Sequence, residues 1–421
     1  MSGFYKKHFL PIITVLFVFL LSYSQEIPDN EEVLESAVST GKLVAGYWIN
    51  NSHASVHSNH YADGCSYYGA CLFGDALNDS SYYKTVYERY TAHIPYRIPK
   101  GNVDSNAIGI LPLHLYLHSQ NRDLLDLGIS AAEDAINHGG YKRNAIDDTY
   151  MTGSLMVQAY RATQDSKYID FCVDYMLHYM GRLQQSNGLY HHRDGGPHCW
   201  GRGNGWGAAS TTELIQVIPE NHPKYNDIIE GYRNHMKGLI DVQKNNGMWM
   251  QLLDSKNPAN WEETSCMGMF LFAMFTGLRM GLLDEETFLD PAKKGWKAVL
   301  NHISSDGRLR DIAVGMWGGQ NESDYLNVNH NDAGNAHGTA GFLWAATAAI
   351  KYFKTTNISR RNDNLSIHIQ NNESKMKRNG RYFDLMGRSK DIILNQSVLP
   401  LNTGIYIRKS NAKGSLFNYL K

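Results

Sequence analysis

The chain has 421 residues, 43% of them hydrophobic and 19% charged, which is enough apolar material for at least one large buried core. Its 40 basic and 41 acidic side chains are interspersed and give a formal net charge of −1. This balance excludes a strongly basic nucleic-acid-binding surface and indicates no attraction to an anionic membrane.

The N-terminal residues are typical of a secretory signal. A positive pair, Lys6–Lys7, precedes the apolar run Leu10–Leu21 and the small residues of Ser22–Ser24. The apolar run is shorter than the roughly 20 residues that span a bilayer, so no stable membrane span is expected. Residues 1–24 are therefore predicted to be a signal peptide. Cleavage would release a secreted or cell-surface protein, or a periplasmic one, that begins at Gln25.

The cysteines form an odd set without the spacing of a metal site: Cys65, Cys71, Cys172, Cys199 and Cys266. Buried free thiols are the favoured interpretation. Export would also allow a disulfide between Cys65 and Cys71, so that alternative stays open.

The middle of the chain predicts helices separated by loops rich in glycine and aromatic residues, with few strands. Apolar residues recur with a helical period in the following segments: Ala107–His118, Leu124–Asn137, Thr149–Thr163, Tyr168–Gln185, Gly207–Val217, Tyr225–Lys244, Ser265–Met280, Pro291–Ile303 and Gly338–Phe353.

Three similar turns follow three of these helices. Asn187, Asn246 and Asp306 each precede a glycine that is followed by apolar or aromatic residues. Their recurrence about every 55–60 residues indicates repeated helical hairpins. Helix pairs of this length can close into a toroid, the (α/α)6 barrel.

The densest group of chemically useful side chains lies between Gly188 and Trp206. Trp200 and Trp206 offer flat faces to a sugar ring, and Arg202 between them offers a planar fork to a carboxylate. The surrounding glycines allow a ligand to approach the backbone closely. The alternative is a structural loop whose tryptophans fill the core.

Acidic residues stand at the starts of several predicted helices. They are Asp104, the pair Asp147 and Asp148, and Glu263. Taken alone, helix capping explains them well. In a helical toroid, however, they would gather at one end, where a pocket would form. Asp147 and Asp148 point roughly 100° apart on a helix, so both cannot face the same pocket.

A third polar group contains His330, Asp332 and His337. These residue types can bind a metal, but the surrounding asparagines and glycines do not form a recognised zinc spacing. A polar pocket wall is the favoured interpretation.

The C-terminal region changes composition. Residues 355–379 are polar, and strand-like pieces with turn residues follow. Phe383–Arg388 and Pro400–Arg408 resemble the paired motifs of the sorting tail of type nine secretion substrates. That resemblance implies the type nine secretion machinery as a partner. A small β-appendage that binds carbohydrate or packs on the core is the alternative.

Several motifs together resemble glycoside hydrolase family 105, the unsaturated rhamnogalacturonyl hydrolases and their unsaturated glucuronyl relatives. The resemblance extends from about Tyr47 to Phe353. The matching motifs are Asn102–Ser105, Asp148–Met151, Asn187–His192, Trp200–Trp206, Glu263–Ser265 and Asn331–Thr339.

The resemblance implies an (α/α)6 catalytic domain over residues 25–354, followed by the linker and tail of residues 355–421. It implies an enzyme that removes a 4,5-unsaturated uronic acid from the non-reducing end of an oligosaccharide left by a polysaccharide lyase. In such enzymes an acid protonates C4, water adds at C5, and the resulting hemiketal collapses. No cofactor and no metal are implied.

The roles of individual residues follow from the same resemblance. Asp148 matches the catalytic acid, and Asp104 matches a second carboxylate near the reacting ring. Positions that contact the substrate are matched by His192, Trp200, Arg202, Trp206 and His337. Ile146 departs from the family, in which an aromatic residue is common two positions before the acid. The loop between His192 and Trp200 is short.

Other functions remain open at this point. Another barrel enzyme, such as a sugar epimerase or an inverting glycosidase, would use different acid and base groups. A non-catalytic surface carbohydrate-binding protein would bind without turnover, although the acidic residues argue against it. The sequence does not distinguish a substrate derived from pectic rhamnogalacturonan from one derived from a sulfated glucuronan-rhamnan such as ulvan.

Overall fold

The computed structural model describes residues 27–50, 55–316, 319–330 and 332–376, with residues 357–376 described by their backbone alone. Four short strands between residues 382 and 406 are also described. The predicted signal peptide, residues 1–24, lies outside the described residues. Among the described residues, no helix is long and apolar enough to cross a membrane.

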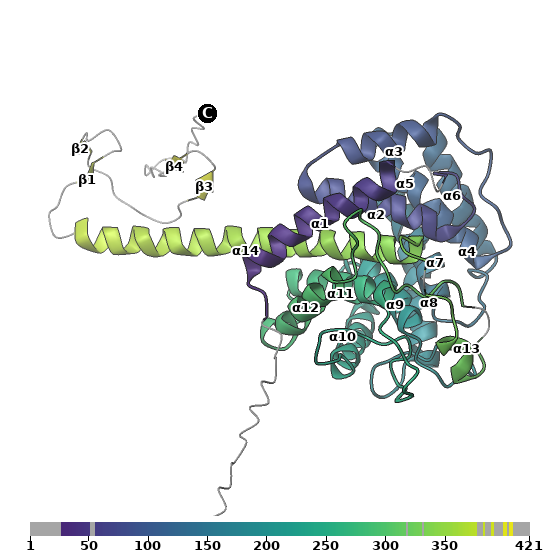
Figure 1. The fold of residues 1–421 in the computed structure, drawn as a ribbon. Helices are drawn as coiled ribbons and strands as arrows, with labels where there is room; N and C mark the ends of the chain where they lie inside the picture. The colour runs from purple at the N-terminus through teal and green to yellow at the C-terminus, as the bar shows by residue number, and fades with distance from the viewer. Residues whose placement is uncertain are drawn as a thin grey trace, which may run out of the picture.

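In the part of the chain that the structure describes, twelve helices alternate between an inner and an outer ring (Figure 1). The inner helices are α2 (Tyr61–Leu77), α5 (Ile110–Ser119), α7 (Asp148–Thr163), α9 (Gly201–Ile215), α11 (Thr264–Arg279) and α14 (Ala336–Met376). The outer helices are α1 (Asn30–Asn50), α3 (Ser81–Thr91), α6 (Arg122–Asn137), α8 (Ser166–Leu183), α10 (Tyr225–Asp241) and α12 (Glu285–Leu300).

Contacts between neighbouring inner helices close the ring. Each inner helix packs against the next one in the chain, and α14 packs against α2. All residues of α9 are buried, whereas α10 buries one face only. An interior helix is apolar all round and a surface helix has one apolar stripe, so this contrast follows the sequence pattern. The predicted (α/α)6 barrel is confirmed.

Three short helices lie in the connections. These are α4 (Val103–Asn106), the 3-10 helix η1 (Ala107–Gly109) and α13 (Glu322–Leu326). The last stands in the long connection between α12 and α14.

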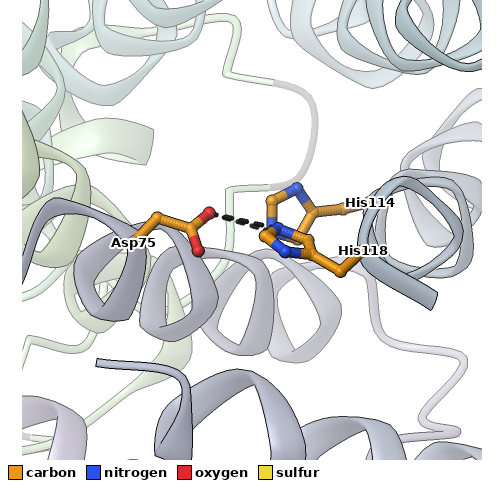
Figure 2. A group of neighbouring side chains, drawn as sticks. All are labelled: Asp75, His114 and His118. Atoms are coloured by element: carbon orange, nitrogen blue, oxygen red, sulfur yellow. Dashed lines mark ion pairs between the residues drawn. The ribbon is translucent and has the colours of Figure 1, made fainter. Parts of the chain in front are cut away.

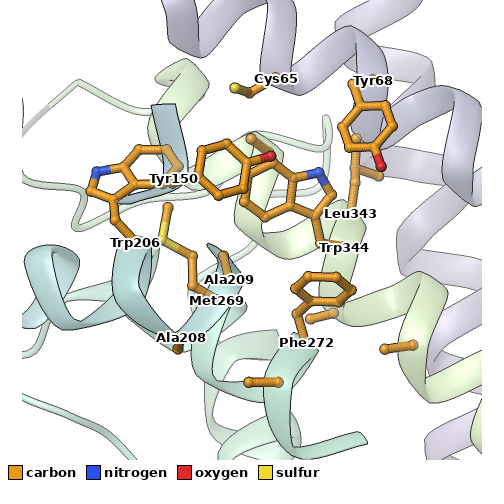
Figure 3. Close-up of a cluster of buried hydrophobic side chains, with 14 of the residues drawn as sticks. Cys65, Tyr68, Tyr150, Trp206, Ala208, Ala209, Met269, Phe272, Leu343 and Trp344 are labelled. Atoms are coloured by element: carbon orange, nitrogen blue, oxygen red, sulfur yellow. The ribbon is translucent and has the colours of Figure 1, made fainter. Parts of the chain in front are cut away.

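An apolar layer fills the middle of the barrel (Figure 3). Tyr150 packs against Trp206 and Trp344, with ring centroids 4.9 and 5.0 Å apart, and Phe272 contacts Trp344. Burying aromatic rings of this size contributes much of the stability of a core. The layer separates the N-terminal ends of the inner helices from their C-terminal ends.

The glycine-rich segment after Trp200 is helical, which corrects the prediction of a loop and of a helix beginning at Gly207. Helix α9 begins at Gly201. A Cβ atom on Gly203 would lie 3.0 Å from Ile146, and one on Gly205 would lie 2.6 Å from Met269. The glycines therefore let α9 approach its neighbours closely.

Two other helix boundaries differ from the prediction. Helix α12 begins at Glu285, so Pro291 lies inside the helix and not at its first turn. Helix α14 continues to Met376 and does not end near Phe353 (Figure 1). No glycine or proline occurs between Gly341 and Gly380, so no residue there breaks the helix.

The three recurrent turns have the same conformation. Gly188, Gly247 and Gly307 have φ of +85°, +88° and +88°. A Cβ atom on each would lie 2.0–2.5 Å from a backbone carbonyl of the next outer helix, at Asn234, Lys294 and Leu43 respectively. The turn glycine therefore packs one outer helix against the next, and this repeat confirms the hairpin period found in the sequence.

We expect Gly247→Ala to destabilise the protein strongly. The left-handed backbone costs about 1–2 kcal/mol for alanine, and the clash with Lys294 adds about 1–3 kcal/mol of overpacking. Gly281→Ala is the matched control, because Gly281 has φ of +68° but nothing within 4 Å of an added Cβ. Urea unfolding of both variants measures the difference. Equal losses of stability would show that the close packing is unimportant.

All five cysteines are free and buried, as the favoured interpretation predicted. In the C-terminal region, β1 (Tyr382–Phe383) pairs antiparallel with β2 (Ser389–Lys390), and β3 (Leu399–Leu401) pairs with β4 (Gly404–Tyr406). The sequence predicts strand-like pieces over residues 382–388 and 401–408. β1 and β4 lie within these pieces, β3 overlaps the start of the second, and β2 directly follows the first. The rest of both sorting-tail motifs lies outside the described residues.

Candidate active site

The predicted site residues lie near the N-terminal ends of the inner helices. Asp148 begins α7, Arg202 is the second residue of α9, and His337 is the second residue of α14. The positive ends of the helix dipoles meet here, which favours a negatively charged ligand.

Asp104 and Asp148 are joined by Arg143. The Arg143 side chain donates to both oxygens of Asp104, at 3.0 and 3.1 Å, and its Nε donates to Asp148 at 2.8 Å. Asp148 also accepts from the Arg143 backbone N–H and the Tyr179 hydroxyl, both at 2.6 Å. Because Asp148 is fully buried, these donors hold its carboxylate inside the protein.

Burial and the neighbouring hydrogen-bond donors have opposite effects on the pKa of each carboxyl group. Burial raises the pKa of Asp148, and Arg143 and Tyr179 oppose that rise. Burial likewise raises the pKa of Asp104, against the charge of Arg143. Asp104 is the more accessible of the two, with 29% of its side chain exposed.

Asp147 belongs to a different part of the site. Its Oδ2 lies 3.1 Å from His192 Nε2, and His192 Nδ1 lies 2.8 Å from the Tyr325 hydroxyl of α13. Burial would raise the pKa of Asp147, but the hydrogen bond from His192 and the charges of Arg143 and Arg202 outweigh burial and leave the pKa lowered.

Arg202 stacks on Trp200, with its guanidinium carbon 4.5 Å from the ring centroid. Its Nη1 donates to the carbonyl of Ala313 and lies 3.4 Å from Ser265. Its Nε is buried and has no hydrogen-bond partner among the residues that the structure describes. An unpaired buried donor is costly, so this atom indicates a place for a ligand acceptor.

His337 holds a tyrosine at the site. Asn335 Oδ1 accepts from His337 Nδ1 at 2.7 Å, so Nε2 accepts from the Tyr61 hydroxyl at 2.8 Å. Burial and the charge of Arg202 lower the pKa of His337, which keeps the ring neutral. Burial raises the pKa of Tyr61. The charge of Arg202 lowers this pKa, and the charges of Asp147 and Asp104 raise it.

Two of the predicted residues, Trp206 and Glu263, mainly make contacts that stabilise the fold. Trp206 is fully buried in the apolar layer, where it contacts Tyr61, with ring centroids 5.9 Å apart. Glu263 caps α11 by accepting from the backbone N–H groups of Ser265 and Cys266. It also accepts from Ala313 N–H, and so supports the segment that holds Arg202.

Four residues that contact the predicted site residues were not themselves predicted from the sequence: Arg143, Tyr61, Tyr179 and Tyr325. Arg143 stands only five residues before Asp148, so its charge near the helix start was a usable signal. Tyr61 and Tyr325 come from distant parts of the chain. No local pattern marked either of them.

The arrangement can bind an anion and move a proton. Arg202, which is held against the buried Trp200, and the helix N-termini favour a carboxylate, and Asp147 lies beside them with a histidine that fixes its position. These groups suit acid–base chemistry on an acidic sugar.

Known proteins that are similar to this chain are glycoside hydrolases. Residues 41–353 match the model of Glycosyl Hydrolase Family 88. The chain is 30% identical over 173 residues to an unsaturated 3S-rhamnoglycuronyl hydrolase from Alteromonas sp. (strain LOR), covering 39% of this chain and 42% of that protein. It is 25% identical over 129 residues to the unsaturated rhamnogalacturonyl hydrolase YesR of Bacillus subtilis (strain 168), covering 31% and 35%.

Both of these matches span less than two thirds of the relative's length. Among solved structures, a family 105 glycoside hydrolase from C. acetobutylicum ATCC 824 aligns with a TM-score of 0.66 at 21% identity, covering 73% of this chain and 98% of that one. This likeness shows the fold. Because the family model covers most of the sequence, the chain belongs to Glycosyl Hydrolase Family 88, a family of glycoside hydrolases.

Proposed function

We propose that this protein removes a 4,5-unsaturated uronic acid from the non-reducing end of oligosaccharides produced by a polysaccharide lyase. The observation that carries the proposal is the buried, partly unpaired Arg202 stacked on Trp200, with Asp147 beside it. An unsaturated uronate offers a carboxylate for Arg202. Export by the signal peptide and the type nine tail is part of the same proposal.

The reaction consumes one water molecule. A carboxylic acid gives its proton to C4, and the hydroxide part of water adds to C5 while the carboxylate takes the other proton. The C5 hemiketal then opens to a C5 ketone as the bond from C5 to the ring oxygen breaks, and the ring oxygen becomes the C1 hydroxyl. The resulting C1 hemiacetal collapses to an aldehyde: the bond from C1 to the aglycone oxygen breaks, and the hydroxyl proton goes to that oxygen. The products are a keto-uronate and the shortened oligosaccharide. A single carboxyl group can carry the proton in both directions.

We propose Asp147 for this proton transfer, in place of the Asp148 that the resemblance indicated. Asp147 lies between His192 and the charge of Arg202, whereas the Asp148 oxygens are held by Arg143 and Tyr179. A carboxylate whose oxygens all accept internal hydrogen bonds is poorly placed to reach a sugar. Asp148 would then position Arg143, which in turn holds Asp104 near the ring.

A pH dependence follows from the lowered pKa of Asp147. The acid must be protonated to act on C4, so activity is retained below its pKa and is lost as pH rises through it. A substrate carboxylate paired with Arg202 would cancel part of the positive charge that lowers this pKa. We therefore expect the kcat profile to fall at a higher pH than the kcat/KM profile. Profiles that fall at the same pH would contradict this coupling.

For the aglycone we propose a rhamnose, and a 3-sulfated one in preference to the rhamnose of pectin. The relative from Alteromonas is the support for this choice, because its match is both longer and more identical than that of YesR. Ulvan-type chains carry such a sugar next to the uronate.

The experiment uses tag-free protein and lyase digests of ulvan and of rhamnogalacturonan. The double bond conjugated with the carboxylate absorbs in the ultraviolet, so turnover is followed as loss of that absorbance. We expect loss with at least one digest, and faster loss with the ulvan digest. Tight binding without loss of absorbance would indicate a carbohydrate-binding protein instead. Turnover of saturated oligosaccharides only would indicate another glycosidase.

A further inference from the structure

A second polar group lies at the opposite end of the barrel (Figure 2). Asp75 is in the last turn of α2, and His114 and His118 stand one turn apart on α5. Residues four apart lie on the same face of a helix, so both imidazoles point toward Asp75. The apolar layer of Figure 3 separates this group from the proposed reaction.

The distances between the three side chains suit a metal ion. Asp75 Oδ2 lies 3.3 Å from His118 Nε2 and 3.7 Å from His114 Nε2. Tetrahedral bonds of about 2.0–2.1 Å place ligand atoms about 3.3–3.4 Å apart. One ligand atom from each of the three residues lies within 4.8 Å of the others. Two imidazoles and a carboxylate are a common ligand set for zinc.

An unpaired atom points to the same conclusion. His114 is only 4% exposed, and its Nε2 has no hydrogen-bond partner within the described part of the chain. A buried polar atom without a partner costs free energy. Binding a cation through this nitrogen would remove that cost.

The space beside the three residues can complete the coordination. They line a cavity of about 310 Å³ at the C-terminal ends of α2, α5, α7, α9 and α11. The negative ends of the helix dipoles favour a cation there. Glu213 neutralises Arg161 across the cavity at 2.8 Å. Lys351 and Arg279 also line the cavity, and their charge favours water or an anion as the fourth ligand.

We propose that Asp75, His114 and His118 bind one divalent transition-metal ion of the Zn²⁺ class. The ion would join α2 to α5, two neighbouring inner helices, and stabilise the closed ring. The site is independent of the proposed reaction. The sequence resemblance implied no metal. The proposed ligands come from two separate helices and form no sequence motif.

The test uses tag-free protein that has been treated with a chelator and dialysed. Co²⁺ reports tetrahedral coordination by its visible absorption, and calorimetry with Zn²⁺ gives the stoichiometry. We expect one ion per chain and a melting temperature that rises with added Zn²⁺. Asp75→Asn and His118→Ala should each lose the bound ion and the rise in melting temperature, while turnover of the unsaturated substrate is retained.

His222→Ala is the matched control. His222 pairs with Asp170 at 3.3 Å on the outer surface, so this variant removes a similar histidine–carboxylate pair elsewhere. It should bind the ion as the unmodified protein does. Circular dichroism checks that each variant folds, and Asp75→Asn preserves the shape of the side chain. Absence of binding by the unmodified protein, or equal binding by both site variants, would refute the site. Stabilisation by inorganic phosphate but not by Zn²⁺ would show an anion site instead.

Discussion

Replacement of Asp147 by asparagine is expected to lower kcat by about 10²–10⁴-fold, because the amide has no acidic proton to give to C4. The asparagine oxygen can still accept from His192 Nε2, so the fold and the position of the histidine should be preserved. Initial rates of absorbance loss at saturating substrate measure the effect. Thermal unfolding confirms that stability is little changed.

Asp148→Asn is the matched partner of this variant. Arg143 and Tyr179 donate hydrogen bonds to the Asp148 carboxylate, and the amide nitrogen of asparagine cannot accept them. We therefore expect Asp148→Asn to lower stability and to reduce kcat less than Asp147→Asn does. The opposite outcome is equally informative. If Asp148→Asn abolishes turnover in a folded protein and Asp147→Asn does not, the assignment made from the sequence resemblance is correct and ours is not.

Replacement of Arg202 by lysine should raise KM about 10–100-fold with a smaller change in kcat. Lysine keeps the charge but loses the planar fork and the stacking on Trp200. A charge-assisted hydrogen bond to a carboxylate is worth roughly 1.5–3 kcal/mol, and each 1.4 kcal/mol is tenfold in affinity. Steady-state kinetics on the unsaturated oligosaccharide measures both constants.

The structure also gives Arg202 a supporting role, because its Nη1 donates to the Ala313 carbonyl. Arg161→Lys separates the two roles. Arg161 is an arginine paired with the buried Glu213 at the far end of the barrel, so its substitution should lower stability and leave KM unchanged. If Arg202→Lys behaves in the same way, Arg202 only supports the segment around Ala313 and does not bind the substrate.

Most of the architecture could be predicted from the sequence because helical periodicity is a local property. The apolar residues of α6 and α8 recur with the helix period, and the turns at Gly188, Gly247 and Gly307 mark the hairpins. The first helices were not assigned, although Val33, Ala37, Val44 and Trp48 of α1 follow the same period. The start of α9 was misplaced because glycine usually indicates a loop, and here it permits close packing.

The sequence by itself indicated repeated helical hairpins, the order of the motifs and the gathering of Asp104, Asp148 and Glu263 at one end of a helical toroid. It also showed that Asp147 and Asp148 cannot both face one pocket. Which of the two faces His192 depends on the rotation of α7, and the packing of Tyr150 against Trp206 and Trp344 sets that rotation. The contacts of Tyr325 with His192, and of Asp75 with α5, join residues far apart in the chain. Only the tertiary structure decides them, because no local pattern records which distant side chains meet once the ring has closed.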